Sequence, residues 1–311
     1  MNERQLIAVK LITSHILLPL FLCLASFLVK NDALLLVSIS QTVLCILFLA
    51  GYWEFFGLRF KNLFCAGIQL IILFILLYRL LHPQGFTPQA CLVTIFAILQ
   101  AWLFIVLSKI IFVIFERSPS AYSIKFPFRE GLYLVTDGGN SRISRLMNYH
   151  YHSAQHKKRK TNLSMLYATD IVKIKDTPGR FMPLKNEEYP IYGEKLYAPM
   201  DGLVVKIENT IPDNAPYVGK YPYNTGNTIV IKNENRYLLL GHLRQGSILV
   251  KEGEMVQVNQ LIAEAGNSGL SERPHLHMQL MESDSENYWF GKGISLLTGG
   301  KPLYKNRILK L

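Results

Sequence analysis

Long apolar stretches dominate the first third of the chain. Four of them, each with few charges, lie at residues 11–29, 33–53, 63–81 and 90–115. A helix needs about 20 apolar residues to cross the hydrocarbon core of a bilayer. The pattern therefore predicts a bundle of about four transmembrane α-helices. We do not expect the first stretch to be a cleaved signal peptide, because it lacks a clear small-residue cleavage site and three more stretches follow.

The pattern changes after Phe115, where the chain becomes mixed and polar. Short apolar runs then alternate with turns, at residues 166–174, 202–209, 227–233, 236–243, 255–266 and 275–280. The sequence NENR at 233–236 is typical of a tight hairpin turn, and almost no amphipathic-helix pattern interrupts the series. We expect an all-β antiparallel sandwich or barrel. The predicted division is a helical domain at 1–116, a connector at 117–149, the β domain at 150–285 and a C-terminal tail at 286–311.

The charge of the chain indicates the class of its binding partner, and its cysteine content limits which residue types can bind a metal. The net charge is +11, and residues 117–311 hold 26 Lys and Arg against 18 Asp and Glu. This balance favours an anionic neighbour such as a phospholipid surface or an acidic wall polymer. No aromatic residues are interleaved with the basic cluster HKKRK at 156–160, so we do not expect nucleic acid. All four cysteines lie before residue 117, so a metal in the polar part must use His, Asp or Glu.

The candidate chemistry centres on RPHLHMQL at residues 273–280. On a strand, His275 and His277 point to the same face, with Leu276 on the other. Neutral imidazole is the commonest metal ligand, although packed histidines are the alternative. Asp170, in YATDIV, is a carboxylate flanked by apolar residues, which is costly unless it is paired or metal-bound. Zinc takes about four ligands and keeps one position open for water in catalytic sites. The chain has no HExxH motif.

Three segments together resemble a known family. They are LYAPMDGLVVKI (196–207), TIVIKNENRYLLLGHL (228–243) and GEMVQVNQLIAEAGNSGLSERPHLHMQL (253–280). Their order and spacing are similar to those of the lysostaphin-type zinc metallopeptidases, also called LytM-like or LasA-like peptidoglycan endopeptidases. The resemblance covers about residues 150–285. It implies a duplicated hybrid β motif, a Zn²⁺ cofactor and hydrolysis of the peptide cross-links of peptidoglycan by a membrane-anchored enzyme.

The resemblance also implies a role for each candidate residue. Asp170 and His277 would bind zinc, His275 would act as the general base on the zinc-bound water, and His242 would hydrogen-bond the developing oxyanion. The chemistry agrees with these roles, because zinc lowers the pKa of its water and polarises a carbonyl. A neighbouring histidine accepts the proton near neutral pH, and a second donor stabilises the tetrahedral intermediate.

One departure concerns the first zinc histidine. The usual family pattern is HxxxD, but Leu166 stands four residues before Asp170. Related sequences have an NxH form with a longer gap, which NYHYHSAQHKKRKTNLSMLYATDI resembles. We align His150 with that histidine, with His152 and then His156 as alternatives. If none reaches the metal, the domain would be a catalytically inactive module that binds the wall or activates another hydrolase.

The location and the alternatives follow from these expectations. Four spans would put both ends on one side, and the positive-inside rule would then make the β domain cytoplasmic. Peptidoglycan lies outside, so we expect the bacterial inner (cytoplasmic) membrane with the β domain on the periplasmic, extracytoplasmic side. We also expect the helices to bind a membrane-protein partner.

A phosphocarrier on a related β-sandwich is a third hypothesis for the function, which the HxH pair disfavours. The bond that is cut is left open among D-Ala–diaminopimelate cross-links, glycine bridges and non-wall peptides.

Overall fold

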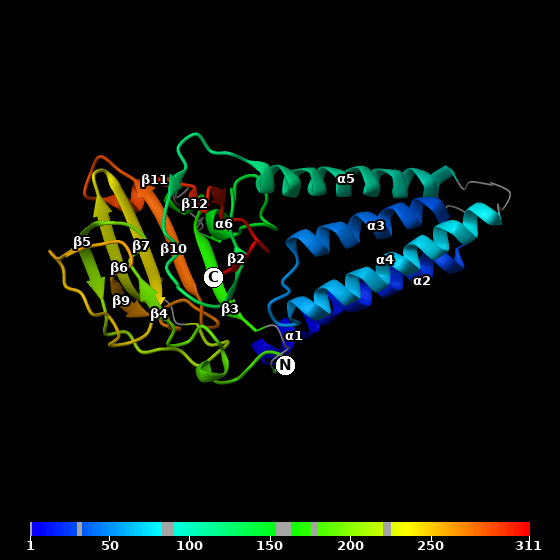
Figure 1. Cartoon of the computed structure of the whole chain (residues 1–311). Helices are drawn as coiled ribbons and strands as arrows, with labels where there is room; N and C mark the ends of the chain where they lie inside the picture. The colour runs from blue at the N-terminus through cyan, green and yellow to red at the C-terminus, as the bar shows by residue number, and fades with distance from the viewer. Residues whose placement is uncertain (1, 30–32, 83–89, 154–162, 176–179, 220–224) are drawn as a thin grey trace. The chain divides into compact units, whose positions relative to one another are not determined.

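The chain forms two compact units, Met1–Phe112 and Val113–Leu311. The computed structural model describes residues 2–29, 33–82, 90–153, 163–175, 180–219 and 225–311 (Figure 1). The first unit is helical and the second is built mainly of strands. The boundary falls near the C-terminal end of the last long helix, three residues before it ends at Phe115.

The helical unit confirms the expected apolar helices. Its elements are α1 (Glu3–Ile12), the π-helical turn η1 (Thr13–Leu17), α2 (Leu18–Leu28), α3 (Ala33–Ala50), α4 (Leu58–Leu81) and α5 (Ala90–Phe115). Three continuous helices are long and apolar enough to cross a membrane: Glu3–Leu28, Leu58–Leu81 and Val93–Phe115. The fourth, Leu34–Ala50, is shorter, because the helix ends before Gly51. The first helix begins earlier than its apolar stretch, since Asn2 caps it and pairs with Gln5 in a capping box.

Polar side chains inside this unit satisfy backbone groups near the helix ends. Arg79 donates to the carbonyl oxygens of Phe27 at 2.6 Å and Val29 at 2.7 Å, near the end of α2. The Nε2 atom of buried His15 accepts the Tyr52 N–H at 2.9 Å. These contacts hold α2 beside α4, and the turn η1 beside the end of α3.

The second unit confirms the expected antiparallel β architecture. Its main sheet has nine strands in the order β14-β2-β3-β10-β7-β6-β5-β8, with β11 paired to β10 (Figure 1). The strands are β2 (Leu132–Asp137), β3 (Thr169–Ile174), β5 (Gly202–Glu208), β6 (Asn227–Asn233), β7 (Arg236–Leu243), β8 (Met255–Val256), β10 (Leu276–Glu282), β11 (Lys292–Ile294) and β14 (Ile308–Lys310). The predicted NENR turn joins β6 to β7, with Glu234 in the left-handed region at φ 54°.

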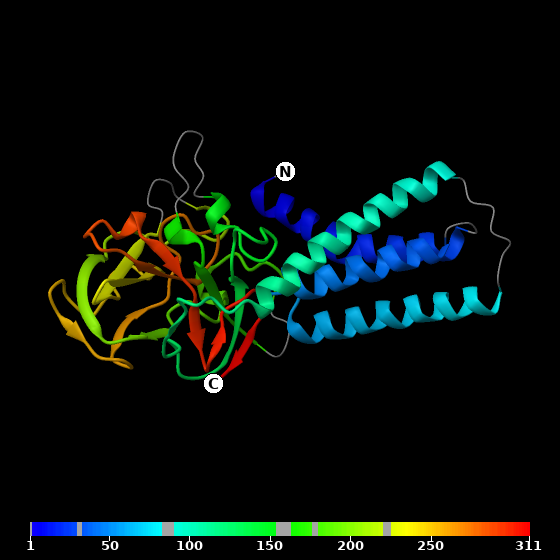
Figure 2. The same cartoon turned by 90° about the horizontal axis from the view of Figure 1, so that it is seen from above.

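Two smaller sheets and several short helical turns complete the unit. β1 (Tyr122–Ser123) pairs in parallel with β12 (Leu296–Thr298), which pairs with β13 (Lys301–Pro302), and β4 (Lys195–Tyr197) pairs with β9 (Leu261–Glu264). The short helices are α6 (His150–Ser153), η2 (Leu163–Met165), η3 (Asn186–Glu188) and η4 (Tyr288–Phe290). Residues 117–149 thus supply β1 and β2, and residues 286–311 supply β11 to β14. Figure 2 shows the red C-terminal strands, of which β14 pairs with β2 at the edge of the main sheet.

The main sheet places alternate residues of its central strands on opposite faces. Leu276, Met278 and Leu280 of β10 belong to the main hydrophobic core. The intervening residues His277, Gln279 and Met281 are also buried, but on the other face. The candidate site therefore lies on the face of β10 that is turned away from the main core.

Candidate metal centre

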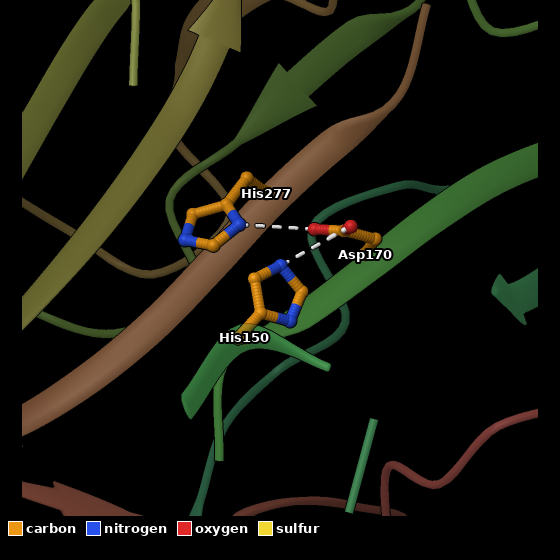
Figure 3. A group of neighbouring side chains, drawn as sticks. All are labelled: His150, Asp170 and His277. Carbon is orange, nitrogen blue, oxygen red and sulfur yellow. Dashed lines mark hydrogen bonds and ion pairs between the residues drawn. The ribbon is translucent and has the colours of Figure 1, made fainter. Parts of the chain in front are cut away.

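Among the residues that the structure describes, His150, Asp170 and His277 form a cluster of potential metal ligands whose ligand atoms lie within 4.8 Å of one another. Asp170 Oδ2 lies 3.3 Å from His150 Nε2, and Asp170 Oδ1 lies 2.9 Å from His277 Nδ1 (Figure 3). All three side chains are buried. Asp170 on β3 and His277 on β10 are register partners in an antiparallel pair, so their side chains share one face.

The third potential ligand comes from outside the sheet. His150 is the first residue of the short helix α6, which follows Asn148 and Tyr149. The alternative His152 belongs to the same turn, but its side chain lies outside the described part of the chain, as does all of residue 156. Of the three alternatives, the structure thus places the His150 ring at Asp170.

Asn148 holds the His150 ring in place. This fully buried side chain donates from Nδ2 to the carbonyl oxygens of Gly139 and Ala168, both at 2.8 Å. Its Oδ1 accepts His150 Nδ1–H at 2.7 Å and the His150 backbone N–H at 3.2 Å. With its proton on Nδ1, the ring can offer Nε2, which lies 3.3 Å from Asp170 Oδ2, to a metal ion.

Gln279 holds the His277 ring by a hydrogen bond, as Asn148 holds that of His150. His277 Nε2–H donates to Gln279 Oε1 at 3.2 Å, and Gln279 Nε2 donates to Met281 Sδ at 3.0 Å. With its proton on Nε2, the ring can offer Nδ1, which lies 2.9 Å from Asp170 Oδ1, to a metal ion. Sequence reasoning assigned no role to Gln279 or Asn148, although both lie in the quoted motifs, two residues from a ligand.

His275 lies just before β10 and faces the same carboxylate. Its Nδ1–H donates to the Arg273 carbonyl oxygen at 2.8 Å, with Ser271 Oγ at 3.2 Å. Its Nε2 lies 3.6 Å from Asp170 Oδ1. The ring therefore turns a lone pair towards the cluster, which is the arrangement that a general base requires.

His242 completes the group and has an unusual backbone. The ring centroid lies 4.7 Å from that of His275, and its Nδ1–H donates to the Ser268 carbonyl oxygen at 2.7 Å. The residue has φ 58°, a left-handed conformation that costs about 1–3 kcal/mol in a non-glycine residue. Two backbone hydrogen bonds hold this conformation. The His242 N–H donates to the Thr225 carbonyl oxygen, and the His242 carbonyl oxygen accepts the Gly266 N–H. Such strain is typical of functional positions.

Burial and charge set the protonation of the cluster. Burial opposes ionisation of Asp170, but His150 and His275 outweigh it and hold the pKa of the carboxyl well below its usual range. Burial likewise opposes protonation of His150, but Asp170 raises its pKa above the ordinary value. Burial, chiefly, lowers the pKa of His275, and burial with the neighbouring His275 and His277 lowers that of His242. His242 is therefore neutral at pH 7, so its Nε2 donates a hydrogen bond only after it gains a proton.

A buried ion pair lies behind the cluster. Lys305 Nζ is 3.7 Å from Asp137 Oδ1, and both side chains are almost fully buried. Asp137 ends β2 and is the register partner of Asp170 on β3. Burial raises the pKa of Asp137 to about 6, while Lys305 acts in the opposite direction. The pair links the C-terminal segment to the strand next to the site.

The donor set fits a catalytic zinc ion. Two imidazoles and one carboxylate are a known catalytic zinc set that leaves a position for water. The outer hydrogen bonds hold the rings of His150, His275 and His277 with one nitrogen each towards the Asp170 carboxylate, where a proton or a metal cation can lie between nitrogen and oxygen. Ligands at zinc bond lengths in a tetrahedron lie about 3.3 Å apart. His277 lies 2.9 Å from Asp170 Oδ1 and His150 lies 3.3 Å from Oδ2, and one ligand atom from each of the three residues lies within 4.8 Å of the others.

Comparisons with known proteins relate part of the β unit to a peptidase family. Residues 189–288, which include His242, His275 and His277, match the model of peptidase family M23. The peptidoglycan DD-endopeptidase ShyA of Vibrio cholerae is 36% identical over 89 residues, which cover 29% of this chain and 18% of that protein. An uncharacterized metalloprotease of Buchnera aphidicola is 32% identical over 107 residues, 34% of this chain and 27% of that protein. The chain thus spans about a quarter or less of the length of these curated relatives.

Solved structures with the same kind of domain are more distant. A zinc-containing peptidase from Vibrio cholerae is 21% identical, covers 56% of this chain and 39% of that chain, and has a TM-score of 0.31. The catalytic domain of lysostaphin from Staphylococcus simulans is 24% identical, covers 40% and 73%, and has a TM-score of 0.26. Because both scores are below 0.5, the assignment relies on the sequence match and the motifs. The chain contains a peptidase M23 domain of the LytM/lysostaphin type.

Proposed function

We propose that this protein is a membrane-anchored zinc metalloendopeptidase that hydrolyses peptide cross-links of bacterial peptidoglycan. One observation carries the proposal: the imidazoles of His150, His275 and His277, each hydrogen-bonded at its outer ring nitrogen, converge on the Asp170 carboxylate next to the segment that matches the M23 family. His150, Asp170 and His277 would hold the zinc ion, leaving His275 and His242 for the reaction.

The chemistry divides between the metal and the protein. A bound zinc ion would lower the pKa of a water molecule and polarise the scissile carbonyl. The Nε2 lone pair of His275 accepts a proton from the attacking water and returns it to the leaving amine. His242 is neutral at rest, so it would take a proton from solvent at Nε2 before it donates to the carbonyl oxygen on which negative charge develops. The hydrogen bonds from His275 to Arg273 and from His242 to Ser268 keep both rings oriented for these steps.

The substrate class follows from the relatives and the charge. Two Vibrio cholerae relatives are named peptidoglycan DD-endopeptidases, ShyA and ShyB. The basic part of this chain suits a polymer rich in carboxylates, which is the charge character of peptide cross-links in the wall. Of the open bonds, the relatives favour the D-Ala–diaminopimelate type over glycine bridges.

A digestion experiment tests the proposal. The full chain in detergent, loaded with zinc, is incubated with purified sacculi, and released fragments are identified by mass spectrometry. We expect fragments with new amino termini at cross-links, and no release from His275→Ala, which leaves the three proposed ligands in place. A zinc-loaded native chain that binds sacculi and releases nothing would instead support the inactive, wall-binding module.

The proposed location is the extracytoplasmic face of the inner membrane, because peptidoglycan lies there. The β unit contains no native cysteine, so Lys251→Cys places a single exposed thiol in it. We expect a membrane-impermeant maleimide to label this variant in intact spheroplasts, well above the background of the native chain with its helical cysteines. Labelling only after lysis would place the domain in the cytoplasm and exclude peptidoglycan as its substrate.

A further inference from the structure

The residue that follows helix α5 is bound into the β unit next to the candidate metal centre. Glu116 Oε1 accepts Asn140 Nδ2–H at 2.8 Å and the Tyr167 hydroxyl at 3.2 Å. Asn140 Nδ2 also donates to the Tyr167 hydroxyl oxygen at 3.1 Å. One carboxylate oxygen thus joins two side chains that are 27 residues apart in the sequence.

These two side chains belong to the segments that carry the first two ligands. Asn140 begins the segment that leads to His150, and Tyr167 lies three residues before Asp170. Two further links join the same segments. The Ser141 N–H donates to the Leu166 carbonyl oxygen at 3.0 Å. Asn148 bridges the carbonyl oxygens of Gly139 and Ala168. Glu116 therefore adds to the hydrogen bonds between the segments that carry His150 and Asp170.

The last turn of α5 packs closely at the same place. Val113, in the same compact unit as the site, is almost fully buried. A Cβ atom at Gly139 would collide with the Val113 side chain, and Gly139 has φ +85°, where other residues are strained. The chain thus has a glycine where the helix end approaches the ligand-bearing segment.

We propose that Glu116 is a positioning residue for the metal centre, through which the end of α5 fixes the separation of the segments that deliver His150 and Asp170. The inference rests on the proposed zinc site, and it makes the end of a candidate membrane-spanning helix part of the frame of that site. Loss of Glu116 leaves the direct Asn140–Tyr167 bond and the two inner links in place, but it loosens the frame, so that His150 and Asp170 are held less closely at one ion. Zinc binding should weaken even though Glu116 touches no ligand.

The expected size of the effect follows from metal sites in general. Removal of an outer hydrogen-bonding partner costs about 10–100-fold in metal affinity. Glu116 acts through Asn140 and Tyr167, so we expect about a tenfold loss for Glu116→Ala, at the lower end of that range. Glu116→Gln keeps an oxygen at Oε1 that accepts both hydrogen bonds, so it should retain near-native affinity.

The test uses the full chain in detergent with three variants. Glu116→Ala, Glu116→Gln and the control Glu252→Ala are compared by zinc competition with a chromophoric chelator. Glu252 accepts the Ile207 N–H at 2.7 Å and lies 3.6 Å from Lys206 Nζ, both on β5. Glu252→Ala therefore also removes a hydrogen-bonded glutamate, but one that contacts neither ligand-bearing segment. A second readout is the visible absorption of the Co²⁺-loaded protein, which reports ligand geometry and is not moved by stability alone.

The proposal expects weaker zinc binding and an altered Co²⁺ spectrum in Glu116→Ala only. It is overturned if Glu116→Ala keeps native affinity and spectrum, or if Glu252→Ala loses as much affinity as Glu116→Ala. If the native chain binds zinc and digests sacculi, and Glu116→Ala does both equally well, only the positioning role is refuted. A native chain that binds no zinc would refute both this role and the proposed function.

Discussion

Asn148→Ala should lower both the stability of the chain and its affinity for zinc, and a matched control distinguishes the two effects. The substitution removes four hydrogen bonds of a fully buried side chain, two donated to Gly139 and Ala168 and two accepted from His150. Each buried hydrogen bond contributes about 1 kcal/mol net, so the loss in unfolding free energy should be about 4 kcal/mol. The His150 ring would also lose the acceptor that fixes its tautomer, so zinc affinity should fall about 10–100-fold.

Asn148→Asp is the matched control. The aspartate keeps an oxygen for His150 but loses the donors to Gly139 and Ala168. We expect about 2 kcal/mol or more of destabilisation from the two lost bonds and the buried charge, with zinc affinity close to native. Stability of the metal-free chain is measured by pulse proteolysis in urea, and zinc affinity by chelator competition. If Asn148→Ala were destabilised yet bound zinc as tightly as the native chain, the assignment of His150 as an oriented ligand would be refuted.

Three further predictions follow. Gln279→Leu removes the acceptor for His277 Nε2–H, so zinc affinity should fall about tenfold while Gln279→Glu retains it; equal affinities by competition would contradict this. Asp137→Asn leaves the Lys305 ammonium buried without its carboxylate and should lower the free energy of unfolding, measured by pulse proteolysis, by about 3–5 kcal/mol. The double variant Asp137→Asn/Lys305→Met should recover most of that loss; a double variant no more stable than the single one would contradict the pairing. Because burial lowers the pKa of His275, the base stays neutral below the ordinary histidine value, so the acid limb of kcat/KM should lie below about 6.5. An acid limb above that value would contradict the assignment of His275 as the base.

Much of the fold was predictable because its signals are local. The apolar stretches predict the helices, and alternation within β10 puts His277 and His275 on the side opposite Leu276. The second apolar stretch yields a shorter helix than predicted, because Gly51 and the residues after it lie outside α3. Composition alone does not reveal where a helix stops inside an apolar run.

The candidate site was predictable in part, for a physical reason. Asp170 and His277 lie on strands whose faces follow from period-two alternation, and the motif resemblance then named both. His150 lies 20 residues from Asp170, beyond any local periodicity, and an NxH resemblance alone favoured it over His152. The parts played by Asn148, Gln279 and Glu116 depend on hydrogen bonds between segments far apart in the sequence or on ring tautomers. No spacing rule encodes such contacts.

The zinc content of the full chain tests the central claim most directly. Native protein and His150→Ala are stripped of metal, reconstituted with zinc, dialysed and measured by mass spectrometry of the elements. The account predicts one zinc ion per native chain and its loss in His150→Ala, since two remaining ligands, Asp170 and His277, hold the ion too weakly to survive dialysis. No zinc in the native chain, or full retention in His150→Ala, would contradict it.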